Sequence, residues 1–82
     1  MTITKSMELF STHDMALASA ISLFFFLDSI DKSNPSKVLF RFKKTPKLNK
    51  LIDDYWQGKL RVDPQSYFNQ IKILKTRIYA ES

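Results

Sequence analysis

The chain has 82 residues, of which 44% are apolar and 26% charged, and its formal net charge is +5. This length and balance indicate one small globular domain, residues 1–82, of marginal stability, because a chain of this size buries only about 60% of its unfolded surface. One glycine, one histidine and no cysteine exclude glycine-rich phosphate loops, histidine-built zinc sites and thiol chemistry.

No segment of the sequence has the features of a membrane span or a secretory signal. The longest apolar stretch, residues 15–27, is interrupted by Ser19 and Ser22 and is shorter than the roughly 20 residues that span a bilayer. The first residues contain too short an apolar run for a signal peptide. We therefore expect a cytoplasmic protein that does not enter a membrane.

The first predicted helix begins after Ser11, because Ser11 and Asp14 have the spacing of a capping box. The apolar residues that follow have the i, i+4, i+7, i+8 spacing of one helix face: Leu17, Ile21, Phe24 and Phe25. A helix that is apolar nearly all round lies at the centre of its fold, so this segment is the expected core helix.

Two strands are predicted next. The aromatic run at residues 24–26 favours extended backbone, so a strand is expected over residues 25–30. Residues 37–43 alternate with a period of two, which places Phe40 and Phe42 inward and the basic residues outward. All of these phenylalanines are interpreted as core. Because a hairpin alone is marginally stable, a third strand is expected near residues 6–10.

Two amphipathic helices complete the predicted fold. Thr45 and Pro46 have the residue types of an N-cap and a first helical position, as do Asp63 and Pro64 further on. Gly58 comes where a helix C-terminus needs a residue with positive φ. The apolar faces of the two helices are formed by Leu48, Leu51, Ile52 and Tyr55, and by Tyr67, Phe68, Ile71, Leu74 and Ile78. The expected architecture is α+β: a small antiparallel sheet, a hairpin plus an N-terminal strand, packed by three helices in the order β-α-β-β-α-α.

Four segments of the chain form a recognisable pattern: FSTHD at residues 10–14, KVLFRFKK at 37–44, YWQGKLRVDP at 55–64 and LKTRIY at 74–79. On these segments the sequence resembles a family of small domains of unknown function found in bacterial and phage-related genomes. The resemblance covers nearly the whole chain and implies a free-standing small protein. It implies no activity, substrate or catalytic residues.

Positive charge is concentrated in the middle of the chain. Residues 32–50 hold seven cationic side chains and no acidic one, for +7, whereas residues 1–31 carry −3 and residues 51–82 carry +1, which together give +5. Lysines near a helix N-terminus oppose the helix dipole, so folding stability does not account for those around Thr45. An anion bound at this helix N-terminus accounts for these lysines. The candidate nucleic-acid-binding residues are Lys37, Arg41, Lys43, Lys44, Lys47 and Lys50.

The same charges have a simpler interpretation, a solvated face that keeps the protein dispersed in water. If nucleic acid, DNA or RNA, is the ligand, Arg41 is the side chain expected to make a bidentate phosphate contact. Trp56 lies off the apolar stripe of its helix, which leaves it as a side cap on the core or as an exposed anchor for a partner.

The leading hypothesis is a small, non-catalytic, basic module that binds the phosphate backbone of nucleic acid, with an accessory or regulatory role and no cofactor or metal. The alternative is a protein-interaction or homodimerisation module, because an open strand edge can pair with a second copy. A third interpretation is a hydrolase or nuclease that uses Asp28 and Asp31, which flank the predicted hairpin.

Overall fold

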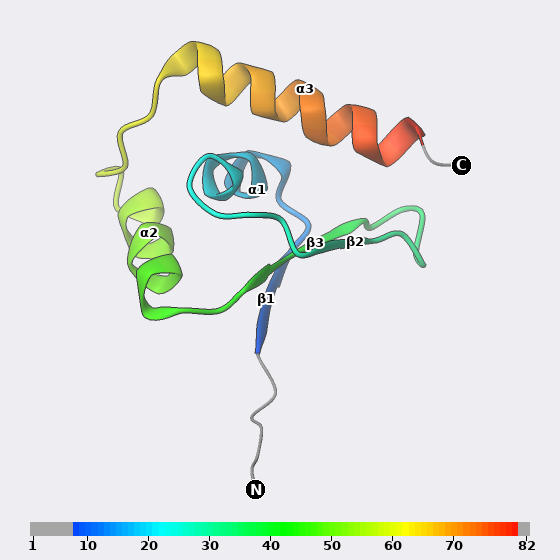
Figure 1. Ribbon diagram of the computed structural model, residues 1–82, viewed down its shortest axis with the longest axis horizontal. Helices are drawn as coiled ribbons and strands as arrows, with labels where there is room; N and C mark the ends of the chain where they lie inside the picture. The colour runs from blue at the N-terminus through cyan, green and yellow to red at the C-terminus, as the bar shows by residue number, and fades with distance from the viewer. Residues whose placement is uncertain (1–7, 81–82) are drawn as a thin grey trace, which may run out of the picture.

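The computed structural model describes residues 8–80. The strands are β1 (Leu9–Thr12), β2 (Ser29–Asp31) and β3 (Leu39–Lys43), and the helices are α1 (Met15–Ser22), α2 (Pro46–Trp56) and α3 (Pro64–Ala80). Their order confirms the predicted β-α-β-β-α-α arrangement of an α+β domain. Figure 1 shows α1 between the sheet and α3, with α2 at one end of the molecule.

The sheet is antiparallel, with β3 in the centre and β1 and β2 at its edges. Phe10 lies opposite Phe42, and Ile30 lies opposite Phe40. Phe40 and Phe42 are 1% and 0% exposed, whereas Arg41 between them points to the other face, as the alternation predicted. The third strand exists but lies slightly later than expected; residues 6 and 7 of the predicted span lie outside the described residues.

The predicted strand over residues 25–30 is wrong over residues 25–28. β2 covers only Ser29–Asp31. Because Ser29 lies opposite Arg41, residues 25 and 26 extend beyond Lys43, where β3 ends, and have no strand to pair with. β3 also begins at Leu39, two residues later than expected. Residues 23–28 therefore form the connection between α1 and β2.

The start of α1 also differs from the prediction. The N-cap is Asp14, whose Oδ1 accepts hydrogen bonds from the backbone N–H groups of Ala16 and Leu17 at 3.0 and 3.2 Å. Ser11 is not the cap, because it belongs to β1 and lies opposite Arg41. A short acidic side chain one residue before the helix satisfies the free N–H groups and favours the positive end of the helix dipole.

The predicted core helix is central but shorter than expected. Residues 17–21 of α1 are all buried, and this helix packs against α3 and α2. It ends at Ser22, after which the backbone N–H groups of Phe24 and Phe25 both donate to the carbonyl of Ile21 in a tight turn. Phe24 is therefore not on the buried face and is 53% exposed.

The two later helices begin as predicted. Thr45 Oγ1 accepts from the N–H of Leu48 at 3.1 Å, and Asp63 Oδ2 accepts from the N–H of Ser66 at 2.8 Å. Gly58 has the expected positive φ, 73°. The buried face of α3 includes Leu74, but Phe68 is 57% exposed, contrary to the prediction, and the Lys72 ammonium lies 4.8 Å from the centre of its ring.

Candidate interaction surface

Three of the six predicted nucleic-acid-binding residues come together where β3 leads into α2. Lys43 ends β3, Lys44 follows it, and Lys47 lies in the first turn of α2, and all three residues are exposed. We call these residues the lysine cluster. Within residues 8–80, Lys43 and Lys47 make no ion pair, and Lys44 Nζ lies 3.8 Å from Glu8 Oε1.

The other three predicted residues do not join this cluster. Lys37 lies before β3, six residues from Lys43, which corresponds to about 20 Å of extended chain. Lys50 Nζ contacts both carboxylate oxygens of Asp54 at 3.0 and 3.2 Å, one helical turn away. Arg41 forms an ion pair with Asp31 on the neighbouring strand β2. The predicted basic surface is thus reduced to three lysines.

Arg41 is held by residues of both edge strands. Its Nη2 lies 2.8 Å from Asp31 Oδ2, and its Nε donates to Ser11 Oγ at 3.3 Å. Asp31 also accepts hydrogen bonds from the Ser33 backbone N–H and hydroxyl at 2.9 and 2.7 Å. These bonds from Ser33, with the neighbouring Arg41 charge, lower the pKa of the Asp31 carboxyl. Because Asp31 already engages part of the guanidinium, Arg41 is poorly placed for the predicted bidentate phosphate contact.

Trp56 is an exposed aromatic rather than a side cap on the core. It is the last residue of α2, is 64% exposed, and packs edge-on against the ring of Tyr55 with 4.9 Å between ring centres. The structure therefore leaves the Trp56 ring accessible, as the second of the two sequence interpretations requires.

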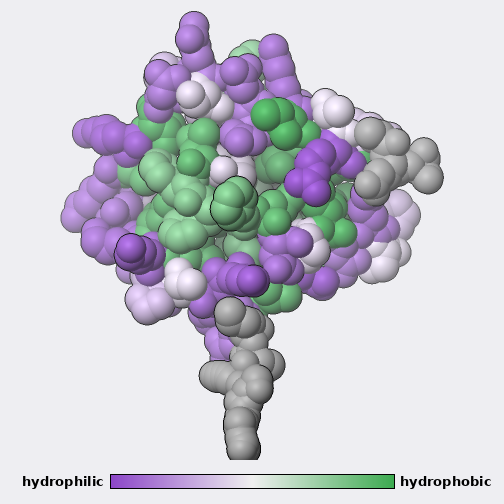
Figure 2. Space-filling view, in the orientation of Figure 1, coloured by the Kyte–Doolittle hydropathy of each residue, from purple (hydrophilic) through white to green (hydrophobic). Residues whose placement is uncertain are grey.

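The largest departure from the sequence prediction is the connection between α1 and β2. Phe26, interpreted as core, is 96% exposed. Phe25 and Leu27 on either side of it pack partly against the core. Such an arrangement anchors the connection at two points and holds the ring between them in water. Figure 2 shows a broad apolar region across this face of the molecule, bordered by hydrophilic groups.

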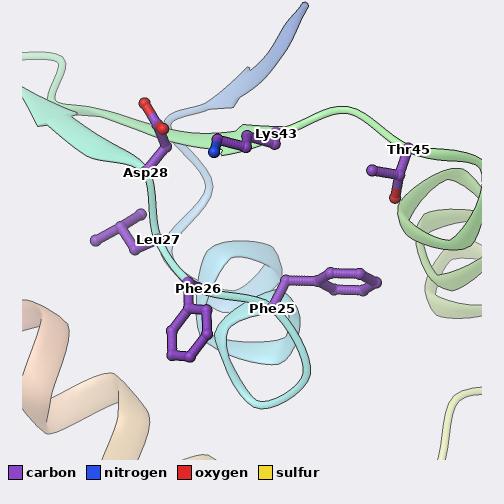
Figure 3. A pocket seen from close by; sticks show the side chains of 6 residues that line it. All are labelled: Phe25, Phe26, Leu27, Asp28, Lys43 and Thr45. Atoms are coloured by element: carbon purple, nitrogen blue, oxygen red, sulfur yellow. The ribbon is translucent and has the colours of Figure 1, made fainter. Parts of the chain in front are cut away.

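Two adjacent hollows adjoin these residues. One, of about 440 Å³, is lined by Phe25, Phe26, Leu27, Asp28, Lys43 and Thr45. In Figure 3 the Phe25 and Phe26 rings point in different directions from the same turn, and the Lys43 side chain extends along the strand toward Asp28. The second, of about 290 Å³, shares Phe25–Leu27 and is lined on its other side by residues of α3.

The α3 residues in the second hollow have the spacing of one helix face: Gln70, Ile73, Leu74 and Arg77. Leu74 is buried, whereas Ile73 is 49% exposed although it is large and apolar. We call Phe25, Phe26, Leu27 and Ile73 together the phenylalanine surface. Contiguous exposed apolar patches on a small protein are typical of sites that bind other macromolecules.

Sequence reasoning missed this surface because an apolar run reads as core whichever way its side chains point. One signal was present: three phenylalanines in succession, 24–26, cannot all face one side of a helix or of a strand. At least one of them has to point away from the core, and in the structure Phe24 and Phe26 do so.

The two aspartates considered for catalysis are in different environments. Asp31 is engaged by Arg41 and Ser33, whereas Asp28 is exposed on the rim of the larger hollow. Among residues 8–80, no group of three or more acidic or histidine side chains is arranged to hold a metal ion. None of the helices in that part of the chain has both the length and the apolar character needed to cross a bilayer.

The fold and its surface define a small α+β domain with an exposed apolar face. The chain belongs to the family described as Domain of unknown function (DUF5659), whose family model matches residues 7–80. This match confirms that the sequence motifs belong to a small domain of unknown function. No curated protein and no solved structure matches the chain.

Proposed function

We propose that this protein is a non-catalytic interaction module that docks a protein partner through the phenylalanine surface. The observation that carries the proposal is the 96% exposure of Phe26 beside two hollows lined partly by apolar side chains. Aromatic side chains beside preformed hollows are the usual energetic centres of protein interfaces, because their burial removes a large apolar area at little entropic cost.

The test is photo-crosslinking in cells of the source organism. A photoreactive phenylalanine analogue replaces Phe26 in one variant and Phe68 in a control. Both positions are exposed, but Phe68 lies on the side of α3 opposite the Ile73–Arg77 face, at about 100° of rotation per residue. Proteins crosslinked only from position 26 are identified, purified and titrated against wild type, Phe26→Ser and Phe68→Ser. Specific loss of affinity with Phe26→Ser is expected, and no crosslink above the Phe68 control would contradict the proposal.

A second candidate function, binding of the phosphate backbone of DNA or RNA, is favoured by the lysine cluster. Lys43 and Lys47 make no ion pair with any residue in 8–80, and with Lys44 they lie around the N-terminus of α2. Ammonium groups at the positive end of a helix dipole oppose folding slightly and attract phosphate. Three lysines can neutralise only a few phosphates, so weak, sequence-independent binding is expected.

Fluorescence anisotropy with a labelled DNA duplex and a labelled RNA strand tests this second function. The variant Lys43→Glu/Lys47→Glu is compared with Lys37→Glu/Lys75→Glu, which changes the net charge equally at exposed positions outside the cluster. If Lys43 and Lys47 contact phosphates, the cluster variant loses more affinity, and its log–log salt slope becomes shallower by about 2. Equal losses in the two variants would show that net charge alone attracts the nucleic acid.

A further inference from the structure

We propose that the partner of the phenylalanine surface is a second copy of this chain, docked about a two-fold axis. This inference rests on the proposed function and names its partner. A two-fold interface requires a surface that is complementary to itself, because both copies use the same patch. Each contact between one residue of the first copy and another residue of the second is repeated with the two copies exchanged. The phenylalanine surface meets this requirement in shape and in charge.

The shape consists of a projecting ring beside hollows. Phe26 is almost fully exposed and lies on the border shared by the two hollows. The larger hollow, at about 440 Å³, has room for a phenyl ring, since cavities of about 150 Å³ already bind benzene. Two copies facing each other can therefore each place Phe26 in the larger hollow of the other.

The charge pattern favours the same pairing. The rim of the larger hollow carries one anion, Asp28, and one cation, Lys43. A two-fold axis at this rim brings Lys43 of each copy toward Asp28 of the other, so that two ion pairs form across the interface. These pairs also offset the repulsion between two molecules that each carry a net charge of +5.

The available area suits a small dimer. Burial of an aromatic ring such as Phe26 removes roughly 150–250 Å² from water, and the half-exposed Ile73 and partly exposed Phe25 and Leu27 bring the apolar area of one copy to roughly 400 Å². A specific interface buries about 800 Å² per partner, of which about 55–65% is apolar. The phenylalanine surface therefore supplies most of the apolar part, and the hydrophilic border seen in Figure 2 supplies the rest.

The strand edges are a poorer route to the same assembly. β1 and β2, the edge strands, have four and three residues. Asp31 in β2 and Ser11 in β1 hold Arg41 on the sheet face. Edges this short offer few main-chain hydrogen bonds to a second copy. The phenylalanine surface is thus the interface to test.

The first experiment is sedimentation velocity on the purified full chain, from micromolar to submillimolar concentration at physiological ionic strength. Wild type is expected to form dimers as concentration rises. Burial of one Phe26 ring lowers the dissociation constant of the dimer by a factor of about 10 to 100. Because the dimer buries two such rings, Phe26→Ser is expected to raise the dissociation constant at least about a hundredfold. Phe68→Ser, the same change on the opposite side of α3, is expected to leave the constant unchanged.

A charge exchange tests the two-fold geometry independently. Asp28→Lys and Lys43→Asp each place like charges across the proposed interface, so each variant alone is expected to dimerise more weakly than wild type. An equimolar mixture restores both ion pairs and is expected to form heterodimers, which native mass spectrometry detects if one variant carries a tag. Far-UV circular dichroism of each variant checks that the fold is retained.

A monomeric wild type at submillimolar concentration, a dimer insensitive to Phe26→Ser, or a mixture that does not recover association would overturn the homodimer. This failure is distinguishable from failure of the proposed function. If the chain is monomeric but position 26 crosslinks to another protein in cells, the surface docks a different partner. If position 26 crosslinks to nothing, the proposed function itself is wrong.

Discussion

The contrasting environments of Phe26 and Phe40 predict opposite responses to the same truncation. Phe40 is 1% exposed within the core cluster, whereas Phe26 is 96% exposed. Truncating a buried phenylalanine to alanine costs about 3–5 kcal/mol through lost burial and the cavity left behind. Truncating an exposed one away from special backbone features costs less than about 0.5 kcal/mol. We therefore expect Phe40→Ala to be strongly destabilising and Phe26→Ala to be nearly neutral.

The size of the domain determines how this is measured. A chain of 82 residues has a free energy of unfolding of about 4–12 kcal/mol, so Phe40→Ala removes a large part of it. Phe40→Leu keeps most of the side-chain volume and serves as a milder, folded comparison. Urea unfolding is followed by far-UV circular dichroism at low micromolar concentration, so that self-association contributes little to the apparent stability.

The result that would refute the reasoning is a loss of about 2 kcal/mol or more for Phe26→Ala with an unchanged urea dependence. Phe26 would then be packed inside the protein, and the surface built on its exposure would not exist. A near-neutral Phe26→Ala beside a destabilised Phe40 variant leaves Phe26 free to serve binding.

Three further predictions concern the core and the acid side of the pH range. Ser19 is fully buried, and its hydroxyl has no hydrogen-bond partner among residues 8–80. Ser19→Ala is therefore expected to raise the free energy of unfolding, measured in urea, by about 1–2 kcal/mol. A decrease would reveal a partner for that hydroxyl. The Tyr67 hydroxyl donates to the Ala16 carbonyl at 3.0 Å and so joins α3 to α1. Tyr67→Phe is expected to lower the free energy of unfolding in urea by about 1 kcal/mol. An unchanged free energy of unfolding would argue against that bond. The Ser66 N–H lowers the pKa of Asp63 in the folded protein, so the stabilisation is present above the unfolded pKa of about 3.9 and is lost as the pH falls through the folded pKa. Asp63→Asn, which keeps an N-cap residue but does not titrate, should make stability less dependent on pH in this acid range, as urea unfolding at a series of pH values would show, and an unaltered pH profile would contradict this role.

The features that were predicted from sequence depend on near neighbours in the chain. Thr45 and Asp63 cap helices because their side chains reach N–H groups three residues ahead, and Gly58 adopts a positive φ because it lacks a Cβ. The alternation around Arg41 separates buried from exposed residues because successive side chains in a strand point to opposite faces. These local rules were sufficient for the element order and for most of the core.

The candidate site was decided by contacts between residues distant in sequence. Arg41 pairs with Asp31 only because the register of β2 and β3 brings the two side chains together, and that pairing removes the arginine from the predicted basic surface. Phe26 has no strand to pair with, because β3 ends before the position that would lie opposite it. The core between α1 and the sheet is already filled by Ile21, Phe40 and Phe42, so the Phe26 ring stays exposed. Hydrophobicity determines that a residue favours burial, but the space available inside the fold determines which residues are buried. For this reason the sequence alone specified the α+β fold, and the tertiary structure specified the surface available to a partner.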